Sequence, residues 1–241
     1  MDRLQLDKNA KLTGRVYFKD EVMWLGLSGS GASFTFDGTK LVLKLKGDNI
    51  AVGENPIDYA RIAVYVDGKR VVDEMIDCAE KEVTVIDHTE NAQSVVEIIK
   101  LSESPMSAVG VEAFTEGSAE ALPEKPLKIE FIGDSITCGY GVDDEDENHQ
   151  FTTATEDVTK AYAYKTAKAL DAEYSMFSAS GYGIVSGYTE GDEPISEQTI
   201  PQFYCSYGFS RGNFAGTAPQ DIPWDFSKYI PQIIVINLGT N

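Results

Sequence analysis

Cysteine, histidine and basic residues are scarce in this 241-residue chain. It has three cysteines, two histidines, and 20 Lys and Arg against 39 Asp and Glu, which gives a formal net charge of −19. The cysteines, Cys78, Cys138 and Cys205, are odd in number and far apart, so they predict neither a disulfide framework nor a zinc site. The acidic excess argues against a nucleic-acid partner, because nucleic acids are bound mainly through Lys and Arg. A neutral substrate fits this charge best.

Long apolar runs are absent as well. No run approaches the ~20 residues that a membrane-spanning helix requires, and residues 1–9 lack the apolar stretch of a secretory signal. We therefore expect a soluble protein with no membrane partner. The localisation stays unknown at this stage: cytoplasmic for the chain as given, or secreted if Met1 is an artefact of expression. The sequence also leaves a homo-oligomer open.

The first half of the sequence has the period-two pattern of β-strands. Apolar and polar side chains alternate through 33–36 and again through 41–46. Asp37-Gly38 and Asp67-Gly68 tolerate the positive φ of a tight turn, so each predicts a β-hairpin. These strands predict an antiparallel β-sandwich over residues 1–120. Further β-rich runs are 62–66, 71–72, 83–86, 95–101 and 109–114.

The pattern changes after the segment 116–126 (EGSAEALPEKP). This segment holds two prolines, one glycine and three acidic residues but little that can pack, so we place a domain boundary there. Beyond it, residues 127–132 predict a short apolar strand, 160–170 an amphipathic helix and 233–238 a second apolar strand. Strand, helix and strand in this order predict an α/β domain with a parallel sheet over residues 121–241.

A serine follows the first of these apolar strands. Ser135 lies in the sequence GDSIT (133–137), at the carboxyl end of a strand, where open α/β sheets hold their ligands. The backbone N–H groups at the start of a following helix can stabilise an oxyanion beside its hydroxyl. An ordinary turn with Ser135 or Thr137 as N-cap is the alternative, and Asp134 is expected to have a capping role. The segment is not a G-x-S-x-G elbow, because Thr137 replaces the second glycine.

Three segments of the second half resemble the motif blocks of the GDSL, or SGNH, hydrolases. Residues 133–137 resemble the first block in the form GDSIT of the carbohydrate-active members. Residues 178–183 (SASGYG) resemble the block that carries an oxyanion-hole glycine, and 239–241 (GTN) resemble the G-x-N block. All three follow strands in the order of the family. The resemblance implies an SGNH-type α/β/α domain.

The sandwich half is similar to the N-terminal jelly roll of carbohydrate esterase family 2. The similarity lies in Gly14-Arg15, in 28–30 (SGS) and in 36–39 (FDGT). It implies a serine esterase that removes O-acetyl groups from plant polysaccharides or oligosaccharides, such as acetylated xylan. An acyl-serine intermediate is implied, and no metal or organic cofactor.

The resemblance also implies the roles of individual residues. Ser135 becomes the nucleophile, and the oxyanion hole consists of its own backbone N–H, the backbone N–H of Gly181 and the side-chain amide of Asn241. Gly183 is a rival to Gly181 for the same role. Three such donors stabilise the negative charge of a tetrahedral intermediate, each typically by ~3 kcal/mol.

The sequence does not offer an obvious base for Ser135, although a neutral hydroxyl needs one, normally His. His88 belongs to the sandwich half, and His149 follows an acidic run. The catalytic His of the family lies well beyond the G-x-N block. We therefore expect a truncated or cleaved chain, whose base belongs to a C-terminal segment beyond Asn241.

Aromatic residues crowd the region between the second and third blocks. Most are expected in the core, while Trp224 and Tyr182 are the candidates for stacking on a sugar ring. The acidic run 143–147 does not fit a calcium loop, because His149 replaces its glycine and Thr155 its glutamate. We expect no metal site there.

Two alternatives to the acetyl esterase stay open. One is a catalytically inactive carbohydrate-binding protein on the same fold, which the lack of a suitable histidine favours. The other is a lipase or thioesterase of the SGNH type, which the sandwich half disfavours. Release of acetate from acetylated sugars separates the three functions.

Overall fold

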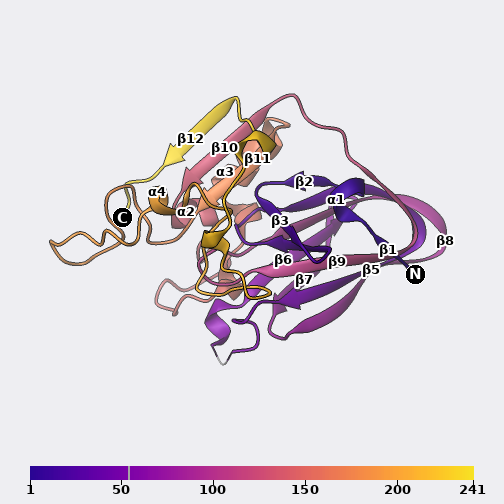
Figure 1. Cartoon of the computed structure of the whole chain (residues 1–241), viewed down its shortest axis with the longest axis horizontal. Helices are drawn as coiled ribbons and strands as arrows, with labels where there is room; N and C mark the ends of the chain where they lie inside the picture. The colour runs from indigo at the N-terminus through magenta and orange to yellow at the C-terminus, as the bar shows by residue number, and fades with distance from the viewer. Residues whose placement is uncertain (54) are drawn as a thin grey trace.

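The computed structural model describes residues 1–53 and 55–241 and contains two sheets of different kinds (Figure 1). The larger sheet has nine antiparallel strands, and the smaller has three parallel strands. The predicted order, an antiparallel β-sandwich followed by an α/β part, is confirmed. The first nine strands are β1 (Asp2–Leu4), β2 (Lys11–Thr13), β3 (Val16–Lys19), β4 (Val22–Leu25), β5 (Gly31–Gly47), β6 (Ala60–Val66), β7 (Lys69–Ile76), β8 (Glu80–Lys100) and β9 (Val109–Ala121).

The α/β part contains the strands β10 (Lys128–Gly133), β11 (Glu173–Ser178) and β12 (Ile233–Asn237). The α-helices are α1 (Leu6–Asn9), α2 (Ser135–Cys138), α3 (Tyr162–Ala169) and α4 (Ile200–Phe203). Short 3-10 turns cover Pro56–Asp58, Thr153–Thr155, Val158–Lys160, Pro219–Asp221 and Phe226–Lys228. Among the helices of the described residues, none is both long and apolar enough to cross a lipid bilayer.

The two longest strands of the sandwich, β5 and β8, pair with each other and curve strongly at one end of the sandwich (Figure 1). β5 is a single strand of 17 residues, so the hairpin predicted at Asp37-Gly38 is wrong. Gly38 lies instead where the register of β5 shifts against both β8 and β9. A Cβ on Gly38 would clash with the carbonyl oxygen of Glu116 and lie 2.6 Å from the Phe36 ring. The glycine permits close approach of two backbones at a bulge rather than a turn.

Other predictions for the sandwich hold, although its strands are longer than expected. The hairpin at Asp67-Gly68 joins β6 to β7, with φ of 50° and 77° at the two turn residues. β8 unites the two runs 83–86 and 95–101 in one strand of 21 residues. β9 continues through 116–121, the first half of the predicted linker, because these residues pair with β5. The domain division at residue 120 stays a prediction.

In the smaller sheet, β10 lies between β11 and β12. The runs predicted at 127–132, 160–170 and 233–238 correspond to β10, α3 and β12, whereas the sequence analysis did not identify β11. Gly133 at the end of β10 is opposite Ser178 of β11 and Asn237 of β12. Because the strands are parallel, their carboxyl ends meet at one edge of the sheet.

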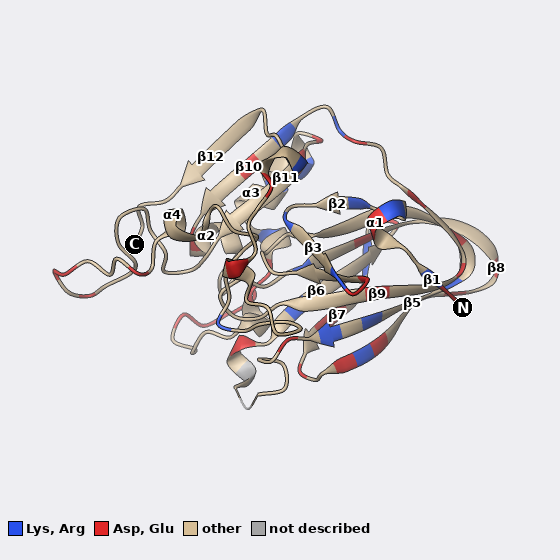
Figure 2. Ribbon diagram, viewed as in Figure 1, with Lys and Arg blue, Asp and Glu red and all other residues tan. Residues whose placement is uncertain are grey.

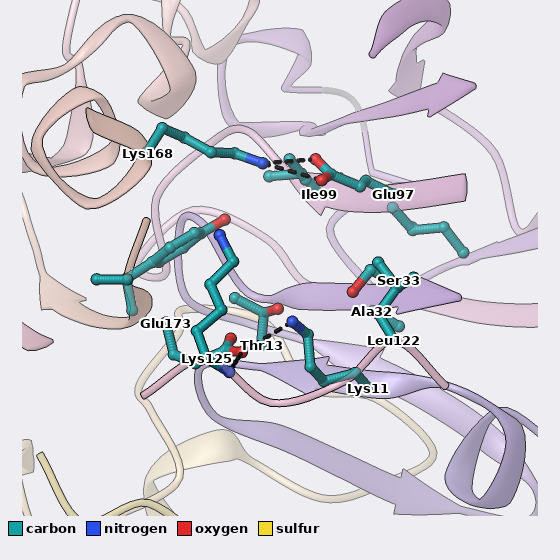
Figure 3. A pocket seen from close by; sticks show the side chains of 13 residues that line it. Lys11, Thr13, Ala32, Ser33, Glu97, Ile99, Leu122, Lys125, Lys168 and Glu173 are labelled. Carbon is teal, nitrogen blue, oxygen red and sulfur yellow. Dashed lines mark hydrogen bonds and ion pairs between the residues drawn. The ribbon is translucent and has the colours of Figure 1, made fainter. Parts of the chain in front are cut away.

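A shared core joins the two parts. Ile99 near the end of β8 and Leu101 directly after it pack with Phe131 of β10, Met176 of β11 and the buried face of α3. Ion pairs flank this core: Lys168 Nζ lies 2.9 Å from Glu97 and Lys11 Nζ lies 2.8 Å from Glu173 (Figure 3). The cavity between them is about 70 Å³, far below the ~300 Å³ of a small ligand pocket, so it is an interface void.

Charged residues are spread over both parts of the molecule. Figure 2 shows Asp and Glu on the sandwich strands, on the connection to β10 and in the loops of the α/β part. The net charge of −19 is therefore not gathered at one edge of a sheet. It favours solubility and carries little information about a binding site.

We expect Gly38→Ala to lower the free energy of unfolding by about 1–3 kcal/mol, because the added Cβ has no room between the paired strands β5 and β9. The exposed Ser118→Ala, on the neighbouring strand β9, is the control and should stay within about 0.5 kcal/mol of the wild type. Chemical denaturation measures both changes. If Gly38→Ala is as stable as the control, the strands do not approach each other as closely at this bulge as described.

Candidate active site

The turn from β10 into α2 presents the predicted nucleophile. Asp134 is buried and is the N-cap of α2: its Oδ1 accepts the N–H of Ile136 at 3.1 Å. The capping role expected for Asp134 is confirmed, and the alternative of Ser135 or Thr137 as N-cap is wrong. Gly133 is required because a Cβ there would clash with the Thr137 side chain. The Ser135 hydroxyl is therefore left free of capping, at the half-buried start of the helix.

The second and third blocks meet at this turn. The side-chain amide nitrogen of Asn241 lies 3.4 Å from Asp134 Oδ2 and 3.4 Å from the carbonyl oxygen of Tyr182. The N–H of Ala179, after β11, donates to the carbonyl of Gly133 at 3.3 Å. Segments more than 100 positions apart are thus brought to one place by the parallel register of β10, β11 and β12.

The two rival glycines differ in what their N–H groups do. The N–H of Gly183 donates to the carbonyl of Gln198 at 3.3 Å, and a Cβ on Gly183 would clash with Ser186. The N–H of Gly181 donates to no acceptor among the described residues, and the same is true of the N–H of Ser135. Gly181 has a φ of 78°, and an added Cβ would lie 3.8 Å from the Tyr188 Cβ. Two unused donors therefore follow the ends of the neighbouring strands β10 and β11, and an oxyanion hole requires such donors.

The two candidate sugar-binding aromatics lie in different surroundings. The ring of Tyr182 packs against Phe209 with 4.9 Å between centroids, while its carbonyl faces Asn241. Trp224 is half-buried, with its ring 5.2 Å from the guanidinium carbon of the buried Arg15. It lines a cavity of about 410 Å³ that reaches across to β3. The sugar-binding roles of both residues stay predictions.

Neither histidine is positioned against the nucleophile by a hydrogen bond within the described part of the chain. His149 is exposed, and its Nδ1 lies 2.8 Å from Asp144 Oδ1 in the acidic loop. His88 is an exposed residue of β8. Asp143 of the same acidic run forms ion pairs with Arg61 and Lys160. Asp143 and Asp144 are therefore engaged with neighbouring side chains.

The sequence of this chain is similar to those of known carbohydrate esterases. Residues 12–126 match the family described as "Carbohydrate esterase 2 N-terminal". The chain is similar to members of carbohydrate esterase family 2. The "Cellulase/esterase CelE" of Acetivibrio thermocellus is 32% identical over 217 residues, which are 89% of this chain and 24% of that protein. The "Acetylxylan esterase / glucomannan deacetylase" of Cellvibrio japonicus is 28% identical over 98% of this chain and 62% of its own length.

A solved structure of the same family shows the same fold. The family 2 carbohydrate esterase of Clostridium thermocellum in complex with cellohexaose has a TM-score of 0.78 and 28% identity. The match covers 96% of this chain and 66% of that one. The chain therefore has the jelly-roll sandwich and the SGNH-type α/β domain of these proteins. It spans 24% and 62% of the lengths of the two curated relatives named above.

The chain also buries a charged cluster next to α2, which was not predicted from the sequence. Lys100, Glu103 and Glu156 are all fully buried. One carboxylate oxygen from each glutamate and the sulfur of Cys138 lie within 4.8 Å of one another. Burial and the charge of Glu103 raise the pKa of Glu156 well above its usual value of 4.5, and burial lowers the pKa of Lys100 to about 8. The only sequence signal was the polar segment that follows the apolar end of β8.

The raised pKa of Glu156 predicts a pH dependence of stability. Since the folded chain binds this proton more tightly than the unfolded chain, the stabilisation is present at low pH and is lost as the pH rises above 4.5 through the folded pKa. Glu156→Gln should therefore lose less thermal stability than the wild type between about pH 5 and about pH 7.5. The control Glu145→Gln, an exposed carboxylate, should follow the wild type, and an identical slope in Glu156→Gln would contradict the burial of its charge.

Proposed function

We propose that this protein is a serine esterase that removes O-acetyl groups from plant polysaccharides or their fragments, such as acetylated xylan. One observation carries the proposal: two unused N–H groups, of Ser135 and Gly181, and the Asn241 amide lie at the same strand ends as the Ser135 hydroxyl. The printed names of the relatives, acetylxylan esterase and glucomannan deacetylase, support a substrate of this class.

In the proposed reaction the Ser135 hydroxyl oxygen attacks the acetyl carbonyl while a base takes its proton. The carbonyl oxygen becomes negatively charged in the tetrahedral intermediate, and the three donors stabilise it. The carbon–oxygen bond to the sugar then breaks, and the sugar hydroxyl leaves with the proton held by the base. A water molecule, activated by the same base, attacks the acetyl-Ser135 ester and releases acetate.

The general base in this proposal is a histidine from a C-terminal segment outside the 241 residues. The engagement of His149 with Asp144, and the position of His88 on an exposed part of β8, support this source. The oxyanion hole itself needs no histidine, because the three groups proposed to bind the oxyanion belong to this chain. A base that approaches Ser135 from outside the described residues would complete the site.

Ser135→Ala should abolish release of acetate from acetylated xylo-oligosaccharides and leave the thermal midpoint within a few degrees of the wild type. The control His149→Ala should retain wild-type activity, since its imidazole is bound within the acidic loop. The assay uses the protein as its gene encodes it, with acetate measured enzymatically. Activity that survives in Ser135→Ala rules out the proposed nucleophile.

The same assay separates the alternative functions. Binding of xylo-oligosaccharides by the wild type without any acetate release would support the carbohydrate-binding protein. Hydrolysis of long acyl esters without hydrolysis of acetylated sugars would support the lipase or thioesterase.

Asn241→Ala should reduce kcat by roughly 10²- to 10³-fold with little change in KM, because its amide acts on the charge that develops in the transition state. Thr240→Ala, at the exposed neighbouring position, is the control and should keep kcat within about threefold. Steady-state kinetics on an acetyl ester measure both. A change confined to KM would show that Asn241 binds the substrate and does not stabilise the oxyanion.

A further inference from the structure

A buried carboxylate of the sandwich half forms a hydrogen bond with the segment of the candidate oxyanion hole. Glu103 lies in the segment between β8 and β9 and is fully buried. Its Oε2 accepts the backbone N–H of Ser180 at 2.6 Å. Ser180 directly precedes Gly181, whose N–H is an unused donor. The sandwich half of the chain thus touches the oxyanion segment through this side chain, as well as through Leu27, which packs with Ala179, and Ser28, whose hydroxyl lies 3.3 Å from that of Ser178.

The backbone of Glu103 is held as well, while its Oε1 accepts no hydrogen bond from the described residues. The backbone N–H of Glu103 donates to Glu156 Oε2 at 2.8 Å, and Lys100 Nζ donates to the Glu103 carbonyl at 3.0 Å. Glu103 Oε2 also lies 3.9 Å from the sulfur of Cys138, at the end of the helix that Ser135 begins. Glu103 therefore contacts both the oxyanion segment and the helix of the nucleophile.

Backbone hydrogen bonds also hold the oxyanion segment: the N–H of Tyr188 donates to the Gly181 carbonyl at 2.7 Å, and the N–H of Tyr182 donates to the Ala179 carbonyl at 3.3 Å. Neither bond involves the peptide unit between Ser180 and Gly181, which carries the Gly181 N–H. Because glycine has wide conformational freedom, the bonds on the neighbouring peptide units set the direction of this N–H. The short hydrogen bond to Ser180 is placed to do this, since it fixes the peptide unit adjacent to the one that carries the Gly181 N–H.

We propose that Glu103 is a positioning residue, which aims the Gly181 N–H at the oxyanion through its bond to Ser180. The inference rests on the proposed esterase function and deepens it, because it assigns to the sandwich a part in catalysis. Glu103 does not touch the substrate in this proposal. Its effect should appear in kcat, since the aim of an oxyanion donor affects the transition state more than the bound substrate.

Two substitutions of Glu103 separate the effect of its side-chain length from the effect of its charge. Glu103→Gln keeps an acceptor oxygen at the same reach and should keep kcat within about threefold of the wild type. Glu103→Asp keeps the charge but shortens the side chain by one CH₂, and it should lower kcat by roughly 10- to 100-fold with KM nearly unchanged. Ser104→Ala is the matched control: it removes a buried hydroxyl of the same segment that bonds to the Phe209 carbonyl, and it should leave kcat unchanged.

Backbone hydrogen exchange gives a readout that does not depend on turnover. The Ser180 amide should exchange at least ~10-fold faster in Glu103→Asp than in the wild type and in Ser104→Ala, because its acceptor has withdrawn. Unchanged Ser180 exchange, or an Asp variant with wild-type kcat where Ser135→Ala is inactive, would overturn the positioning role. A wild type that releases no acetate overturns the proposed function instead, and with it the catalytic part of this inference, while the exchange rates still decide whether Glu103 anchors Ser180.

Discussion

Charged side chains buried between the two sheets need hydrogen-bond partners, and this need ties the sandwich to the α/β part. An unpaired buried charge costs on the order of several kcal/mol, so each must be matched in place. Arg15 of the sandwich donates to the carbonyl oxygens of Tyr204 and Ser206, both in the α/β part. Glu103 accepts from Ser180 in the same way. The sandwich is thus a structural component of the site and not a separate module attached to it.

The parallel sheet brings the residues of the candidate site together. Parallel strands end at a common edge, so the residues that follow β10, β11 and β12 are neighbours although they are far apart in the chain. Ser135, Gly181 and Asn241 each follow one of these strands. The glycine and helix N-terminus leave N–H groups without backbone partners, which is the state that an oxyanion can use.

The local chemistry of the site could be predicted, whereas its support could not. GDSIT at 133–137 combines a strand end, a capping Asp134 and a sharp turn, and all three are properties of adjacent residues. The prediction of a hairpin turn at Gly38 was wrong, because glycine is equally common in turns and where two backbones approach closely. Glu103 gave no signal, since its partner Ser180 lies 77 positions later and only the fold brings them together.

The order of the strands also has a consequence for the time at which the site forms. β10 can pair with β12 only when Ile129 meets Ile233, and β5 must wait for both β8 and β9 before its two edges are filled. Such long-range pairings form slowly, because the entropy cost of closing a large loop comes before the favourable contacts are made. During synthesis the strand pairings of the sandwich can therefore form before the segments around Ser135 are brought together. The emergence of β12 then brings Asn241 to the turn that carries Ser135.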